Sequence, residues 1–93
     1  MNMPASRVAQ IEQRLRAGLA PLRLEIVDES ALHAGHAGAR ESGGGHFAVT
    51  IVSAAFAGQS LLARHRLVYD ALGEVLRREI HALSIRALSP DEA

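Results

Sequence analysis

The segment His46-Phe-Ala-Val-Thr-Ile-Val-Ser-Ala-Ala-Phe-Ala-Gly-Gln-Ser60 combines a strand, a break and a helix start. Apolar residues alternate with small or polar ones over 46–53, which predicts a strand with one buried face. Gly58 ends this pattern, and Ser60 is a typical helix N-cap. The segment therefore predicts a strand followed by a helix. The residues that we expect to face inward from the strand are Phe47, Val49 and Ile51.

Downstream of Ser60, the sequence predicts a helix that runs to about Arg78 and then a strand over 80–88. The apolar stripe of this helix consists of Leu61, Val68, Leu72, Val75 and Leu76, with Tyr69 near it. The inward residues of the strand are Leu83, Ile85 and Ala87. Two strands connected by a helix form a parallel, right-handed unit, so we expect this strand to lie parallel to the one at 46–53.

Upstream, Ser6 is a candidate cap for a first helix, which Gly18 and Pro21 bring to an end. Its apolar stripe consists of Val8, Ile11, Leu15 and Leu19. The alternating residues 22–29 predict a strand that buries Leu22, Leu24 and Ile26. A loop alone connects it to the strand at 46–53, so these two strands should pair antiparallel.

These elements give the order α-β-β-α-β and predict an α+β fold, with two helices on one face of a three-stranded mixed sheet. A chain of 93 residues is expected to form a single domain, here residues 1–93. Residues 30–45 contain five glycines and no periodic apolar face, which predicts a flexible loop. Residues 89–93 are expected to form a frayed tail that starts one helical turn at Pro90.

The composition argues against several classes of function. Ten arginines balance ten acidic residues and there is no lysine, so binding of nucleic acid through bulk charge is disfavoured. Cysteine is absent, which excludes disulfides and a thiolate site built from this chain alone. No apolar run has the length of a membrane span or of a signal-peptide core, so we expect no membrane association and a cytoplasmic location.

Five histidines are an unusual number for so short a chain. His33 and His36 lie three residues apart among small residues of the expected loop, where their nitrogens are accessible to a metal. Two histidines do not complete a tetrahedral site, so further ligands must come from elsewhere, and ordinary solvated side chains are the alternative. His46 has the parity opposite to Phe47, so it should face away from the core and hydrogen-bond a turn.

The second half of the chain offers two more histidines and a basic pair. His65 shares the apolar stripe of its helix, which is typical of a hydrogen-bonded residue at the core edge. His81 has the parity of Leu83, so we expect it at the edge of the apolar sheet face, where it could act with the histidine-bearing loop. Arg64 and Arg66 are either an anion or partner contact or two solvated charges. No pairing of a nucleophile with a base is visible, and no enzyme is predicted.

The chain resembles the BolA-like family over roughly residues 6–92. The resemblance rests on motifs that occur together in the right order. They are Val27-Asp-Glu-Ser30 followed by His33, His46-Phe47 with Val49, Ile51-Val-Ser-Ala-Ala-Phe-Ala-Gly-Gln-Ser60, Arg64-His-Arg-Leu-Val-Tyr69 and Ile80-His-Ala-Leu-Ser-Ile85. This resemblance implies a class II KH-like α-β-β-α-β fold, which agrees with the order derived above.

The resemblance also implies a function. It implies a partner of a monothiol glutaredoxin that shares a [2Fe-2S] cluster and acts in iron–sulfur maturation, trafficking or iron regulation. Glutaredoxin and glutathione would each provide a thiolate, and the positions matching the family's ligands here are His33 and His81, with His36 as an alternative to His33. Because some members are described as transcriptional regulators, a KH-like nucleic-acid-binding regulator is the alternative, and the residues that motivate it are Arg64, Arg66, Arg77 and Arg78. Whether the isolated chain forms a homodimer is left open.

Overall fold

A computed structural model of the chain describes residues 6–30 and 45–93. The helices and strands follow in the order α1 (Arg7–Leu19), β1 (Arg23–Asp28), β2 (Gly45–Val52), α3 (Leu61–Leu72), α4 (Glu74–Glu79) and β3 (Ile80–Leu88). Short 3₁₀ turns, Ala54–Phe56 and Pro90–Glu92, follow β2 and β3. The sheet has the order β1-β2-β3, with β1 antiparallel and β3 parallel to β2, as predicted.

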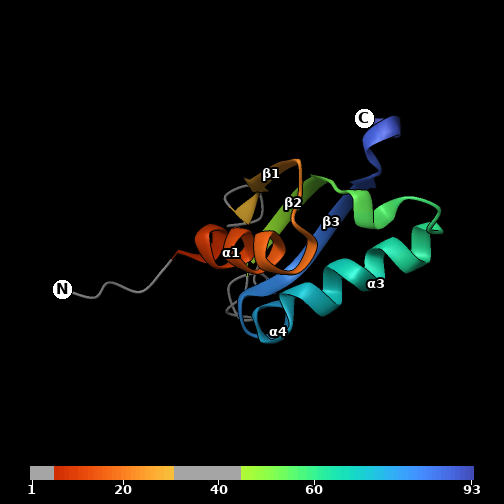
Figure 1. The fold of residues 1–93 in the computed structure, drawn as a ribbon. Coiled ribbons are helices and arrows are strands. Elements are labelled where there is room, and N and C mark those ends of the chain that lie inside the picture. Colours follow the sequence, from red (N-terminus) through yellow and green to blue (C-terminus); the bar gives the residue numbers. More distant parts are fainter. Residues whose placement is uncertain (1–5, 31–44) are drawn as a thin grey trace.

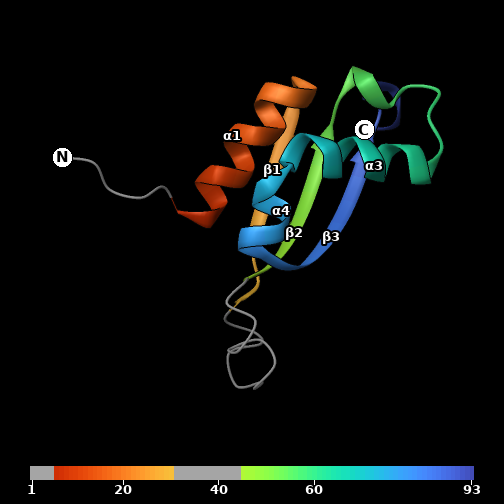
Figure 2. The ribbon, with the colours of Figure 1, turned by 90° about the horizontal axis from the view of Figure 1, so that it is seen from below.

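The three helices lie on one face of the sheet, which confirms the predicted α+β fold (Figures 1 and 2). The core fills the space between the two layers, since the buried residues come from the helices and from alternating positions of the strands. Its members are Ile11, Leu15, Leu19, Phe47, Val49, Ile51, Phe56, Val68, Leu72, Val75, Ile80 and Ala87. Phe56 and Ile80 belong to this core, although the alternation of the sequence did not predict them.

Both predicted serine N-caps are present in the structure. The Ser6 hydroxyl accepts a hydrogen bond from the Ala9 amide at 3.1 Å, and Ser60 does the same for Ala63 at 3.1 Å. The predicted single helix after Ser60 is wrong in one respect, because it is interrupted at Gly73. Gly73 has a φ of +54°, in a region that a side chain disfavours, so the chain changes direction there before α4 begins.

Two residues that were predicted to be inward are exposed. Leu22 is 73% exposed because it precedes β1, and Leu61 is 68% exposed at the first position of α3. Figure 2 shows that the beginning of α3 projects beyond β3, so its first turn has no sheet beneath it. Periodicity assigns a residue to a face of a helix but does not show how far the helix overhangs the sheet.

Ser53 joins the end of β2 to the end of α1. It is 1% exposed, and its hydroxyl donates to the Leu19 carbonyl at 2.6 Å while accepting from the Ala55 amide at 3.1 Å. The Leu19 carbonyl belongs to the last turn of α1, where backbone carbonyls have no hydrogen-bond partner within the helix. This one side chain therefore satisfies two backbone groups and fixes α1 relative to the sheet.

Replacing Ser53 by alanine should lower the free energy of unfolding by about 1–3 kcal/mol, since a buried carbonyl and a partly buried amide lose their partner. Urea denaturation followed by circular dichroism measures this loss. Ser84→Ala, at an exposed position of β3, is the matched control and should change stability little. Equal stability of the two variants would contradict the proposed role of Ser53.

The C-terminal tail forms the predicted helical turn at Pro90, but it is not frayed. Arg64 donates from Nε to the Gln59 carbonyl at 2.9 Å and from a guanidinium nitrogen to the Ala87 carbonyl at 3.0 Å, and it pairs with Glu92. Glu92 also accepts from the Ser89 amide at 2.7 Å. The side chain of Arg64 is 12% exposed, so its charge holds the tail against the start of α3.

The Arg64–Glu92 pair makes stability depend on pH in the acidic range. Hydrogen bonds from Arg64, then from Ser89, lower the pKa of Glu92 from 4.5 to about 2. A carboxylate whose pKa is lower in the folded state stabilises the fold above its unfolded pKa, and this contribution is lost as pH falls through the folded value. The wild type should therefore exceed Glu92→Gln in stability at pH 6, with the difference vanishing between pH 4.5 and about 2.

Denaturation at a series of pH values measures this difference. Glu25→Gln, at an exposed position of β1, serves as the control for a general loss of negative charge. A difference between wild type and Glu92→Gln that stays constant with pH would show that the pair does not contribute in this way.

Candidate metal-binding site

His81 lies at an irregularity in the pairing of β2 with β3. Gly45 is the register partner of Ile80 and His46 is the partner of Ala82, so His81 is an extra residue between two paired positions. Ile80 is buried and His81 is exposed. The prediction that His81 shares the face of Leu83 is therefore wrong, because one inserted residue reverses the alternation.

The same irregularity brings His81 beside His46. The centroids of the two imidazole rings are 5.1 Å apart and the ring planes are inclined by 49°. His46 is half-buried and lies on the sheet face opposite to Phe47, as predicted. This contact was not predicted, although the sequence contains its signal: both histidines stand near the starts of strands that are predicted to be parallel neighbours.

Hydrogen bonds anchor the two ends of segment 31–44 at this place. The Ser30 hydroxyl accepts from the His46 amide at 3.1 Å, and the Glu29 amide donates to the His46 carbonyl at 2.8 Å. The Ser30 amide donates to Asp28 Oδ1 at 2.9 Å, and hydrogen bonds from the side chain and backbone of Ser30 lower the pKa of Asp28. The residues before and after the segment are therefore fixed next to His46.

Position 45 requires a glycine, because the backbone passes close to Ser30 and Phe47 here. A Cβ atom at Gly45 would lie 2.6 Å from the Phe47 ring and 2.8 Å from the Ser30 hydroxyl. Phe47 is fully buried and cannot yield without opening the core. The last glycine before β2 thus lets the chain pass between Ser30 and Phe47.

His33 and His36, the two predicted loop ligands, lie outside the residues that the structure describes. The described residues place both ends of their segment beside His46, and the partner of Gly45 is the residue before His81. Within 6–30 and 45–93, no three histidine, cysteine or acidic side chains form a cluster suited to a metal ion. A complete ligand set at His81 therefore needs groups from elsewhere.

His65 lies apart from this pair. It is half-buried on α3, and the Tyr69 ring meets its ring edge-on with centroids 6.4 Å apart. Its Nε2 is buried and has no hydrogen-bond partner among the described residues. The position at the core edge agrees with the prediction, whereas the predicted hydrogen bonding is not seen at Nε2 within the described residues.

The two arginines of the predicted partner contact differ in their surroundings. Arg64 bonds to two carbonyls and to Glu92, so its guanidinium is used within the chain. Arg66 is exposed. On this geometry Arg66 is available to an external anion, while Arg64 would have to release the C-terminal tail first.

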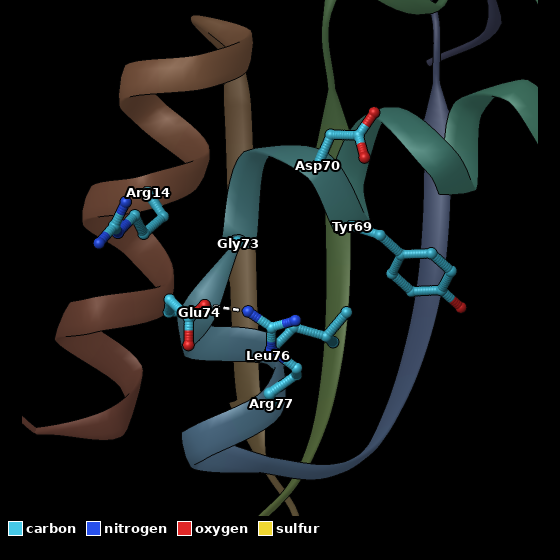
Figure 3. Close-up of a pocket in the computed structure, with 7 residues that line it drawn as sticks. All are labelled: Arg14, Tyr69, Asp70, Gly73, Glu74, Leu76 and Arg77. Atoms are coloured by element: carbon cyan, nitrogen blue, oxygen red, sulfur yellow. Dashed lines mark hydrogen bonds and ion pairs between the residues drawn. The ribbon is translucent and has the colours of Figure 1, made fainter.

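A hollow between α1 and the α3–α4 junction contains none of the predicted site residues (Figure 3). Arg14 borders it from α1, and Glu74 and Arg77 of α4 pair with each other on the other side. Asp70 adds a second carboxylate. Because the charges around the hollow balance, they do not favour a ligand of either sign.

None of the helices in the described ranges combines the length and the apolar character that crossing a bilayer requires.

Comparison with known proteins identifies the family. The BolA-like protein family model matches residues 15–92. A chloroplastic/mitochondrial SufE-like protein 1 from Arabidopsis thaliana is 48% identical over 91 residues, which cover 94% of this chain and 24% of that protein. The DNA-binding transcriptional regulator BolA of Escherichia coli is 41% identical over 83 residues, covering 89% of this chain and 75% of that protein.

A solved structure agrees with these sequence matches. The BolA domain of SufE1 from Arabidopsis thaliana superimposes with a TM-score of 0.81 at 45% identity, covering 98% of this chain and all of that one. The chain thus spans about a quarter of the length of the SufE-like protein, 24%, and corresponds to its BolA domain. Both the sequence and the architecture show that the chain belongs to the BolA-like family.

Proposed function

We propose that the chain is a non-enzymatic adaptor that partners a monothiol glutaredoxin and shares a [2Fe-2S] cluster with it. In this proposal His81 and His33 are the ligands from this chain, with His36 as the alternative to His33, and glutaredoxin and glutathione supply the other two. The observation that carries the proposal is the exposure of His81 beside both ends of the segment that contains His33.

The residues present fit such a group. Histidine is an established ligand of two-iron clusters, and neutral imidazoles in place of thiolates on one iron raise its reduction potential. His81 is exposed, so its ring can be reached by a ligand that a second protein carries. Pairing of Ile80 and Ala82 with β2 fixes the backbone on either side of His81, so only its side-chain rotamer has to be ordered by a ligand.

The lack of cysteine in the chain supports a shared site over a self-contained one. No third histidine, cysteine or acidic side chain clusters with His81 and His46 within residues 6–30 and 45–93, so that part of the chain does not complete the coordination of an iron by itself. A protein with this arrangement contributes orientation and two imidazoles, while the thiolates come from the partner side. This division of ligands is what an adaptor, as opposed to an enzyme, requires.

The test is spectroscopic. When the chain is mixed anaerobically with cluster-loaded monothiol glutaredoxin and glutathione, the visible absorption and circular dichroism of the cluster should change on complex formation. We expect His81→Ala to abolish this change, and the double variant His33→Ala/His36→Ala to abolish or strongly reduce it, because imidazole ligands are lost.

His65→Gln is the matched control, since it removes a histidine on α3 that lies apart from His81. It should leave the spectral change intact, and far-ultraviolet circular dichroism verifies that each variant is folded. An unchanged spectrum of the mixture with His81→Ala would refute the ligand assignment.

A nucleic-acid-binding regulator is the second candidate, and the name of the Escherichia coli relative is the observation that favours it. Arg66 and Arg78 are exposed on α3 and α4, whereas Arg77 pairs with Glu74 and Arg64 holds the tail. If these exposed arginines contact phosphates, each should contribute about one unit to the slope of log affinity against log salt.

Fluorescence anisotropy with duplex DNA at several salt concentrations measures this slope. Arg66→Ala/Arg78→Ala should reduce its magnitude by about two units in this candidate function, while Arg14→Ala on α1 should not alter it. Absence of binding near physiological salt would exclude the regulator and leave the adaptor.

A further inference from the structure

We propose that His46 and His81 form a two-imidazole site for a borderline divalent metal ion such as Zn²⁺ in the chain by itself. This site goes beyond the shared cluster, because it needs neither glutaredoxin nor glutathione. It also needs no residue of segment 31–44. The juxtaposition that carries it is the pair of rings at the beginnings of β2 and β3, with centroids 5.1 Å apart.

The separation of the rings suits one ion held by both. Zinc binds imidazole nitrogen at about 2.0–2.1 Å, which places the ion about 3.2 Å from each ring centroid. Two such centroids around a tetrahedral ion lie about 5 Å apart. The rings are inclined by 49°, so they are not stacked on each other, and rotation of the exposed His81 can turn its nitrogen toward the ion.

The backbone positions of both histidines are fixed before any metal ion binds. His46 is tied through its amide to Ser30 and through its carbonyl to the Glu29 amide. His81 is held between Ile80 and Ala82, which both pair with β2. A metal ion therefore has to order side-chain rotamers but not the chain, and this lowers the entropy lost on binding.

The site is open to solvent on the side of His81, which is exposed, whereas Nε2 of His46 is buried. Ala82, opposite His46 on the neighbouring strand, has a small side chain and is exposed, and Ala48 continues the face that His46 occupies. No third histidine, cysteine or carboxylate completes a cluster within the described residues. Two positions on a tetrahedral ion thus stay open to water or to a group from another molecule, so modest affinity is expected.

Isothermal titration of the full chain with Zn²⁺ alone, without iron, glutathione or glutaredoxin, tests the site. We expect one ion per chain, and His46→Ala and His81→Ala should each weaken binding at least about tenfold. Loss of even an outer-shell partner weakens metal affinity by about 10–100-fold, and these residues are direct ligands. His65→Gln should bind as the wild type does.

Long-range ¹H–¹⁵N spectra of the imidazole rings provide a second readout that does not depend on stability. Addition of Zn²⁺ should shift the ring nitrogens of His46 and His81 and leave those of His65 in place. The variant His33→Ala/His36→Ala should retain the affinity of the wild type.

Binding that survives His46→Ala, or that is lost in His33→Ala/His36→Ala, would overturn the proposal and assign the ion to His81 with the 31–44 segment. Because no partner protein or cluster is present, this result is independent of whether the adaptor function holds.

Discussion

The parallel register between β2 and β3 is the constraint on which the rest of the molecule depends. It sets Phe47 opposite Leu83 and Val49 opposite Ile85, so that apolar residues of both strands face the same helices. Close to where this ladder begins, one extra residue is inserted, and the inserted residue is His81. The pairing that aligns the core therefore also turns an imidazole out of it, since a side chain in a bulge leaves the alternation of its strand.

Because of this topology, the polar side chains at the two ends of the sheet differ in what they contact. At the end where β2 and β3 finish, Ser53 binds the last turn of α1 and Arg64 binds the C-terminal tail, so polar groups are consumed in holding elements together. At the end where both strands begin, His46 and His81 lie side by side and His81 is exposed. Parallel strands begin at the same edge of the sheet and finish at the opposite edge. For this reason, the residues that hold elements together and the two histidines lie at opposite edges.

The sequence predicted the element order, the pairing directions and most of the core, because these follow from local periodicity and from the rules of connection. It did not predict the bulge at His81, since alternation assumes that each residue has one partner across the ladder. It also missed the interruption at Gly73 and the overhang of Leu61, which depend on where the helices lie over the sheet. Its strand position and the family resemblance both single out His81, whereas the contact of its ring with His46 follows only from the structure.

The Arg64-His65-Arg66 triplet shows why a motif is not yet a site. Arg64 satisfies the carbonyls of Gln59, just before α3, and of Ala87, near the end of β3, and it pairs with Glu92, so a requirement of folding accounts for its identity. His65 packs near Tyr69 at the core edge, while Arg66 faces solvent. A resemblance that includes this triplet thus attests to the fold more strongly than to a shared ligand. His81 differs, because an exposed imidazole in a bulge contributes little to the core, and folding alone does not account for a histidine there.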